Sequence, residues 1–289
     1  MTADARIEVT LETAVANAGA GGCPPQLAAA LHYAMFPGGA RIRPQLCLAV
    51  ADACDEDDEP TTNAAAASIE MLHCASLIHD DLPCFDNAAI RRGKPSLHQA
   101  HGERLAVLAG DALIVMAFET LARVAAHRTD RLAALTGIVA ESVGAPDGIA
   151  AGQAWECETR VDLEHYHRAK TGALFAAATR AGAAAAGADP AAWRSLGERL
   201  GLAYQVADDI RDVAAQPEET GKPTGQDALL DRPSIAREMG LQAAVRHLEK
   251  LVSEAIESIP DCPGRAGLQS LMLSRARRFL PRRLWQIAA

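Results

Sequence analysis

The chain has 289 residues, of which 49% are hydrophobic but only 4% aromatic, and its formal net charge is −9 at pH 7. This acidic balance argues against nucleic acid as the main partner. Seven cysteines are scattered without a CxxC pair, which favours reduced thiols in a cytoplasmic protein over a disulfide framework.

The residue pattern predicts a single all-α domain over residues 1–289. Alanine is abundant, cleanly alternating strands are missing, and no glycine-rich or serine-rich linker divides the chain. The amino terminus carries acids where a signal peptide needs a basic and then an apolar run. Because Asp111 and Arg180 interrupt the most apolar stretches, we expect no transmembrane helix.

The first part of the chain predicts two short helices, one over residues 4–18 and one that ends at Phe36. The sequence PGGARIRP follows at residues 37–44. Its glycines permit close approach of the backbone, and its last proline is suited to open the next helix. Arg41 and Arg43 beside this turn are candidate anion ligands, although such a turn taken alone is more often a plain helix connection.

Residues 52–59 are acidic and predict a solvated loop, and residues 62–81 then predict a buried helix. Asp80 and Asp81 end this helix, where the negative end of the helix dipole disfavours carboxylates. A bound cation would resolve this conflict. Asp86 completes a DDxxxxD pattern, and the proline break between the acids can return it to the same side. The group would offer the hard oxygen ligands that Mg²⁺ prefers.

A basic turn follows these acids directly. It contains Arg91, Arg92 and Lys94. Because arginine binds phosphate oxygens in a bidentate manner, the turn is suited to hold a diphosphate bridged to Mg²⁺. Taken singly, the acid pair and the basic turn are more often solvated surface charge. Their combination with an apolar helix within thirty residues favours a binding site.

The middle of the chain adds fewer signals. Residues 103–123 predict a buried helix in which Asp111 is a candidate buried acid, or a residue that bonds within the bundle. Lys170 and Thr171 stand at the start of an alanine-rich helix. A lysine such as Lys170, taken alone, is more often an ordinary surface residue.

A second acidic centre follows, with Gln205 one turn before it. Asp208 and Asp212 lie four positions apart on one helical face, with Asp209 alongside. Like charges at that spacing destabilise a bare helix, so we expect a counter-ion. Lys222 follows in a loop rich in glycine and proline, so a basic residue again follows the acids.

Two carboxylate clusters that face each other across a helical bundle would form a site for a metal-bridged diphosphate. Below them, Leu72, Ala75 and Ser76 would line an apolar channel, which implies a ligand with a diphosphate head and a hydrocarbon tail. Metal ions and basic residues would stabilise charge on departing pyrophosphate, the step by which an allylic carbon–oxygen bond ionises.

The motifs DDLPCFD and DDIRD occur together with GGxRxRP, RRGKP, KTG, YQ and GK. With these motifs the sequence resembles the trans-isoprenyl diphosphate synthase (polyprenyl synthetase) family over nearly its full length. It most resembles the bacterial members that make geranylgeranyl diphosphate for carotenoids and bacteriochlorophyll. The resemblance implies an isoprenoid synthase-type helical bundle around a deep central cavity, usually as a homodimer. It implies a cytoplasmic prenyltransferase that condenses isopentenyl diphosphate with an allylic diphosphate, using Mg²⁺, three ions per active site when diphosphate is bound.

The resemblance also implies a role for each motif residue. The main Mg²⁺ ligands would be Asp80, Asp86 and Asp208, supported by Asp81, Asp209 and Asp212. The allylic diphosphate would be held by Arg91, Lys170 and Lys222. The diphosphate of isopentenyl diphosphate would be held by Arg43, His73 and Arg92, with the backbone of Gly38 and Gly39. The carbocation would be flanked by Thr171 and Gln205, and leaving pyrophosphate would accept the proton.

The chain departs from the family pattern at a few positions. Ala40 stands where a lysine is usual, which removes one cation from the isopentenyl site, and we expect Arg41 or neighbouring contacts to compensate. Tyr204 stands where phenylalanine is usual. The carboxyl terminus, RARRFLPRRLW, is unusually basic and would either close over the diphosphates or form an exposed helix end.

Product length depends on the position five residues before Asp80. Farnesyl enzymes of this type commonly place a bulky aromatic there, but this chain has Ala75. We therefore predict a twenty-carbon product, with Phe118 or Met71 as a deeper floor. If another side chain fills the gap, the product is farnesyl diphosphate.

Functions of other classes stay open at this point. A terpene cyclase would not need the second basic set, and a cation-binding structural protein would bind metal without diphosphate. A non-catalytic partner subunit is favoured by Ala40, but the intact acidic motifs argue against it.

Overall fold

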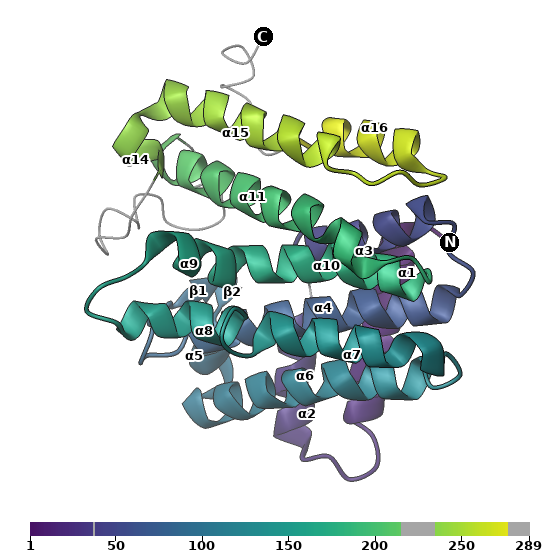
Figure 1. Ribbon diagram of the computed structural model, residues 1–289. Helices are drawn as coiled ribbons and strands as arrows, with labels where there is room; N and C mark the ends of the chain where they lie inside the picture. The colour runs from purple at the N-terminus through teal and green to yellow at the C-terminus, as the bar shows by residue number, and fades with distance from the viewer. Residues whose placement is uncertain (37, 215–234, 277–289) are drawn as a thin grey trace.

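The computed structural model describes residues 1–36, 38–214 and 235–276, apart from the side chains of residues 163 and 164. The described chain is almost entirely helical, which confirms the predicted all-α class (Figure 1). Its α-helices are α1 (Ala3–Ala18), α2 (Pro25–Met35), α3 (Ile42–Ala53), α4 (Glu59–Asp80), α5 (Leu97–His101), α6 (Glu103–Val124), α7 (Thr129–Val143), α8 (Ile149–Ala154), α9 (Leu163–His167), α10 (Ala173–Ala185), α11 (Arg194–Ala214), α14 (Ile235–Met239), α15 (Leu241–Glu257) and α16 (Arg265–Ala276). Shorter turns are η1 (Trp155–Cys157), η2 (Arg168–Gly172) and η3 (Pro190–Trp193).

Helix α4 runs through the middle of the bundle. It contacts α1, α2, α3, α6, α7, α8 and α10. The four alanines at residues 64–67 are fully buried, because small side chains let neighbouring helices approach α4 on all sides. The helix ends at Asp80 and has Asp81 as its C-cap, so it delivers both aspartates to one end of the bundle.

The acidic stretch at residues 52–59 is more structured than predicted. Helix α3 continues to Ala53, and α4 begins at Glu59 rather than at residue 62. Asp58 is 8% exposed and caps α4, accepting hydrogen bonds from the Thr61 backbone N–H (3.3 Å) and hydroxyl (3.1 Å). Pro44 was also misplaced, because it is the third residue of α3 and not the first.

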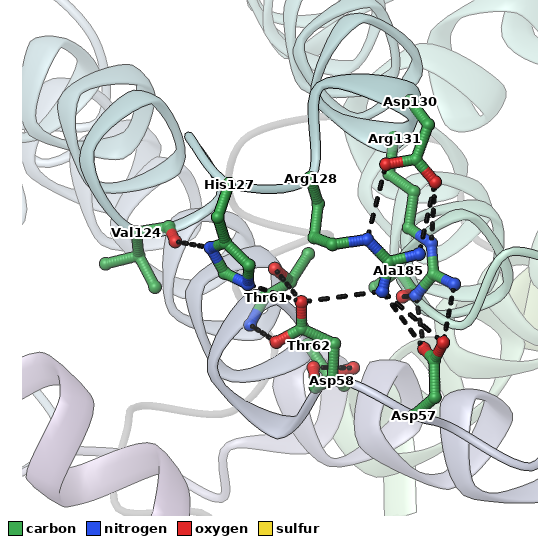
Figure 2. A network of polar contacts seen from close by, with 10 residues as sticks. All are labelled: Asp57, Asp58, Thr61, Thr62, Val124, His127, Arg128, Asp130, Arg131 and Ala185. Atoms are coloured by element: carbon green, nitrogen blue, oxygen red, sulfur yellow. Dashed lines mark hydrogen bonds and ion pairs between the residues drawn. The ribbon is translucent and has the colours of Figure 1, made fainter.

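A network of ion pairs joins α4, α7 and α10 at the end of the bundle far from Asp80 (Figure 2). Arg131 donates to Asp57 Oδ1 at 2.6 Å and to the carbonyl oxygen of Ala185 at 2.5 Å. His127 Nε2 lies 2.6 Å from Asp58 Oδ2, beside the cap of α4. Arg128 contacts both Asp57 and Asp58. These contacts fix the start of α4 relative to the α6–α7 connection and the end of α10.

The opposite end of the bundle carries a small hairpin, which is the form taken by the basic turn. Strand β1 (Ile90–Arg91) pairs antiparallel with β2 (Lys94–Pro95), so Arg91 lies opposite Lys94. In Figure 1 this hairpin appears at the left, at the same end as α5, α8 and α9. Lys222 and the basic carboxyl terminus from residue 277 onward lie outside the described residues.

Helix α6 is long and apolar enough, by length and composition alone, to cross a membrane. Asp111 therefore does not interrupt this stretch as predicted, and its side chain is 62% exposed rather than buried. The apolar window of α6 is 44% buried inside the bundle. A single helix of this kind is weak evidence for a membrane span, because the core helix of a soluble protein passes the same test.

Candidate active site

Asp80 lies where three elements meet. Its Oδ1 accepts a hydrogen bond from Gln153 Nε2 at 2.9 Å, and Lys170 Nζ lies 3.7 Å from the same atom. Asp80 is 8% exposed, and burial raises its pKa, although Lys170 and Gln153 work against that rise. An added cation would stabilise the ionised form of this buried carboxylate.

Asp81 and Asp86 complete the first acidic motif. Arg91 binds Asp81 with two nitrogens: Nε donates to Oδ1 at 3.0 Å and to Oδ2 at 3.1 Å, and Nη2 also donates to Oδ1. The backbone N–H of Asp86 donates to the carbonyl oxygen of Asp80 at 2.9 Å. The chain after α4 thus folds back, and it brings the three aspartates to one end of the helix.

The donor set fits magnesium that arrives together with a phosphate ligand. In the described part of the chain, no three His, Cys, Asp or Glu side chains are close enough to hold a metal ion by themselves. Mg²⁺ keeps several waters and is usually bound by one or two carboxylates plus substrate phosphates, so it needs no complete protein cage. Burial raises the pKa of both Asp80 and Asp81, which is the electrostatic condition that a divalent cation would relieve.

Three residues next to Asp80 form a polar cluster that the sequence analysis did not assign to the site. They are Gln153, Glu156 and Tyr166. Lys170 Nζ lies 2.5 Å from Glu156 Oε1, and the hydroxyl of Tyr166 donates to the same oxygen at 2.6 Å. The run GQAWE, with a glutamine and a glutamate three positions apart on a short helix, was the available signal.

Lys170 and Thr171 lie in the π-helical turn η2 and not at the first turn of α10 as predicted. A π-helical turn is uncommon and often marks a functional site. A Cβ on Gly152 of α8 would lie 2.4 Å from the backbone nitrogen of Lys170, so only glycine lets α8 approach this turn. The Thr171 hydroxyl donates to Gln205 Oε1 at 2.9 Å, which joins the turn to α11.

The second acidic motif lies on α11, and its members have different surroundings. Asp209 is 1% exposed and accepts hydrogen bonds from Gln205 Nε2 (2.9 Å) and from the backbone N–H of Ile235 (2.8 Å). These bonds direct Asp209 toward the start of α14. Asp208 lies 3.3 Å from Arg211, and Asp212 is half-buried on the same helix.

Arg43 is the centre of a second, buried group of basic side chains. It is 9% exposed, its guanidinium carbon lies 4.6 Å from the centroid of the Phe175 ring, and its Nη1 lies 3.3 Å from His73 Nε2. Its Nε is buried without a hydrogen-bond partner among the described residues. Burial, followed by Arg43 and Arg92, lowers the pKa of His73 well below its usual range. The electrostatic potential around this group is therefore positive, which favours the binding of an anion.

The glycine turn before Arg43 is held between two guanidinium groups. A Cβ on Gly38 would lie 2.2 Å from Arg41 Cζ, and one on Gly39 would lie 2.8 Å from Arg92 Cζ. Arg41 is already paired, because it binds Glu70 at 2.7 Å and Glu8 at 2.8 Å. This pairing argues against Arg41 as the residue that compensates for the absent lysine, and compensation by Arg41 or by neighbouring contacts stays a prediction.

The residues predicted to control product length lie in or against the hydrophobic core. Ala75 is 1% exposed and Met71 is fully buried, so neither borders open space in this structure. At 1.5 Å per residue, Ala75 and Met71 lie about 7 Å and about 13 Å along α4 from Asp80. Phe118 is half-buried on α6, the helix joined to α4 by a hydrogen bond from Ser68 to the Ala117 carbonyl (2.8 Å).

Comparison with known proteins shows the family to which the chain belongs. The polyprenyl synthetase family model matches residues 24–266. The chain is 50% identical over 281 residues to a geranylgeranyl diphosphate synthase of Cereibacter sphaeroides, covering 97% of this chain and 98% of the relative. It is 51% identical over 280 residues to one of Rhodobacter capsulatus, covering 97% of each. A geranyltransferase of Helicobacter pylori, solved with magnesium and isoprenyl diphosphate, superposes with a TM-score of 0.82, 32% identity and 96% coverage of each chain.

Proposed function

The chain belongs to the polyprenyl synthetase family, and from that premise we propose its reaction: the magnesium-dependent, head-to-tail condensation of isopentenyl diphosphate with an allylic diphosphate to form geranylgeranyl diphosphate. The enzyme is a prenyltransferase. The proposal assigns this chain's residues to two diphosphate sites and a tail site.

The observation that carries the proposal is that basic side chains form two groups, one in contact with the aspartates at the end of α4 and one around Arg43. Arg91 and Lys170 contact Asp81 and Asp80 at the end of α4. The second group includes His73, which lies 3.3 Å from Arg43, and Arg92, whose charge acts on both. Two groups suit an enzyme that holds two diphosphates at once, whereas a terpene cyclase would need only the first.

For the allylic substrate, we propose that Lys170 and Arg91 bind the diphosphate, with Lys222 as a third cation by family resemblance. Lys170 already lies between two carboxylates, Asp80 and Glu156, so its ammonium is held at the place where the phosphate would enter. The magnesium ions, three when diphosphate is bound, would be held by Asp80, Asp86 and Asp208, with Asp81 and Asp212 in support. Bound magnesium would supply positive charge that stabilises the departing pyrophosphate. Asp209 we assign to orienting Gln205.

For isopentenyl diphosphate, we propose that Arg43 and Arg92 bind the diphosphate and that neutral His73 donates a hydrogen bond to it. The rings of Phe175 and Tyr204 flank Arg43 at 4.6 Å and 5.7 Å from its guanidinium carbon, which fixes the plane of the guanidinium. A preorganised buried cation binds phosphate strongly, because little water must be displaced from it.

Between the two sites, Thr171 and Gln205 would face the allylic cation. The Gln205 amide nitrogen donates to Asp209 and its oxygen accepts from Thr171, so both ends of the amide are fixed. The oxygen lone pairs of this pair would stabilise positive charge on the allylic carbons. After the isopentenyl double bond forms the new carbon–carbon bond, a proton leaves the resulting cation, and we assign pyrophosphate as its acceptor.

The tail would extend along α4 past Ala75 toward Met71, with Phe118 on α6 as a candidate floor. Because these positions are closely packed, a twenty-carbon tail requires side chains of α4 and α6 to move apart. Alanine at position 75 presents the least obstacle to such movement, which favours geranylgeranyl over farnesyl diphosphate.

The test is to incubate the purified protein with Mg²⁺, isopentenyl diphosphate and each allylic primer in turn, and to size the dephosphorylated products. A twenty-carbon alcohol supports the full proposal. A fifteen-carbon stop would keep the chemistry and contradict the tail assignment. Consumption of an allylic diphosphate without isopentenyl diphosphate would revive a cyclase, and no elongation at all would point to a partner subunit.

We further propose a cytoplasmic homodimer. All seven cysteines are free, which suits a reducing compartment. Helix α6 exposes Val107, Leu108 and Val115 at 41%, 54% and 65%, and an apolar helix face of this kind is typical of a subunit contact.

A further inference from the structure

The hairpin that carries Arg91 and Arg92 has a strained tip. Its two-residue turn consists of Arg92 and Gly93, at φ values of 53° and 77°. Turns with two positive φ values strongly favour Asn-Gly or Gly-Gly, because a β-carbon is disfavoured in the left-handed region. Arginine at the first of these positions keeps that backbone only if surrounding contacts hold the hairpin in place.

Lys94 and Tyr33 supply contacts of this kind. Lys94 Nζ donates to the carbonyl oxygens of Phe36 at 2.7 Å and Tyr33 at 3.3 Å, and it lies 4.2 Å from the centroid of the Tyr33 ring. In return, the Tyr33 hydroxyl donates to the carbonyl oxygen of Pro95 at 2.8 Å. Phe36 is the C-cap of α2, so the hairpin is fastened to the last turn of the helix that leads into the glycine turn.

The two arginines of the hairpin differ in how they are held. Arg91 has its own anchor in the carboxylate of Asp81. Arg92 packs on the backbone of Gly39 and hydrogen-bonds Cys74, and it has no carboxylate anchor like that of Arg91 among the contacts of the described residues. A cavity of about 50 Å³ lies beneath the hairpin and is lined in part by Arg92, Lys94, Tyr33 and Cys74. Because this space is not filled by side chains, the polar anchors are the contacts on this face that hold the hairpin.

We propose that Lys94 is a positioning residue for the second diphosphate: by fastening the hairpin to the end of α2, it sets Arg92 against the glycine turn beside Arg43. This inference rests on the proposed function, because it assumes that Arg92 binds isopentenyl diphosphate. It also identifies what holds the basic residues in place in a chain that has Ala40 in its glycine turn.

The test compares K94M with K94R. K94M keeps most of the aliphatic side chain but removes the hydrogen-bond donors of the ammonium group, and K94R restores hydrogen-bond donors. We expect K94M to raise KM for isopentenyl diphosphate by roughly tenfold, with KM for the allylic substrate changed by less than about twofold, because Arg91 keeps its own anchor. K94R should recover most of the loss. K250M removes an exposed lysine whose side chain is 73% exposed on α15, and it controls for the change in net charge.

A double-mutant cycle separates this role from general stabilisation. If Lys94 acts through Arg92, then K94M should weaken isopentenyl diphosphate binding in the wild type but add little to R92Q, as measured by calorimetry without the allylic substrate. Additive effects, equal rises in both KM values, or a lowered melting temperature with unchanged KM would each overturn the proposal. If the wild-type protein neither binds nor consumes isopentenyl diphosphate, the proposed function fails first, and this inference fails with it.

Discussion

Ala40 alters the charge of the glycine turn and leaves its shape intact. The residue is exposed, and its neighbours Gly38 and Gly39 keep the close contacts with Arg41 and Arg92. The arginine next to it cannot substitute for a lysine, because Glu8 and Glu70 hold it in the interior and raise its pKa despite its burial. The proposed isopentenyl site therefore has no cation from position 40 or from Arg41.

We predict that A40K lowers KM for isopentenyl diphosphate by roughly three- to tenfold with little change in kcat, because one charge-assisted contact is added to a site that already forms. Position 40 is exposed, so the longer side chain fits without repacking. Steady-state kinetics with the isopentenyl substrate varied at saturating allylic substrate would measure this. An unchanged KM would mean that Arg43 and Arg92 already supply all the charge that the diphosphate uses.

We propose that the side chain at position 75 decides how far the product tail extends. Ala75 is 1% exposed, so a phenylalanine there fills the path of the tail and also strains the packing of α4, at a cost of about 1–3 kcal/mol in stability. We predict that A75F shifts the product from twenty toward fifteen carbons while the condensation itself continues. Product sizing with a melting curve would show both effects. A twenty-carbon product from a folded A75F would mean that the tail avoids this face of α4.

At the scale of elements, local pattern was sufficient for α4 but not for the turn that carries Lys170. The apolar period and the acid pair located the end of α4 to within one residue. The backbone of the π-helical turn at residues 168–172 packs against Gly152 of a separate helix, and local sequence does not record that contact. For the same reason, the polar cluster of Glu156 and Tyr166 could not be assigned to Lys170 before the fold was known.

The network at the start of α4 is a second case in which partners from distant segments decide the role of a residue. Asp57 is exposed, as predicted, but the prediction missed its partner: Arg131 on α7 donates to it at 2.6 Å and 3.1 Å. These hydrogen bonds, followed by the charges of Arg131 and Arg128, lower the pKa of Asp57 to about 2. An aspartate with a depressed pKa in the folded state stabilises the fold at pH values where it is ionised.

The sign of the pH dependence follows from this shift. Asp57 contributes its full stabilisation above the unfolded-state pKa of about 4, and the contribution is lost as the pH falls from there through about 2. We predict that D57N has a lower melting temperature than the wild type, by a roughly constant difference between pH 5 and 8. This difference should shrink as the pH falls below about 4. Thermal melts across this range would test it, with E249Q on the exposed face of α15 as control. A gap that persists at about pH 2 would contradict the assignment.

At the scale of the whole molecule, the helical class and the family could be read from sequence because their signals repeat along the chain. Alanine-rich segments throughout the chain indicate the all-α class. The helices that carry the two aspartate motifs, α4 and α11, both contact the turn η2, through Asp80 to Lys170 and through Gln205 to Thr171. The outward face of α6 could not be read in this way. Its apolar residues look the same whether they meet the core, a membrane or a second subunit, and only the packing shows which of them remain exposed.

We predict that V115D converts the proposed dimer into a monomer. Val115 is 65% exposed on the apolar face of α6, and an unpaired carboxylate buried in a subunit contact would raise the dissociation constant by roughly 100-fold or more. V9D makes the same change at a valine that is 50% exposed on α1 and should leave the assembly intact. Sedimentation would distinguish the 30.4 kDa chain from a species of twice that mass. A wild-type protein that sediments as one chain would contradict the proposed dimer. A V9D variant that dissociates as readily as V115D would show that the effect is not specific to the apolar face of α6.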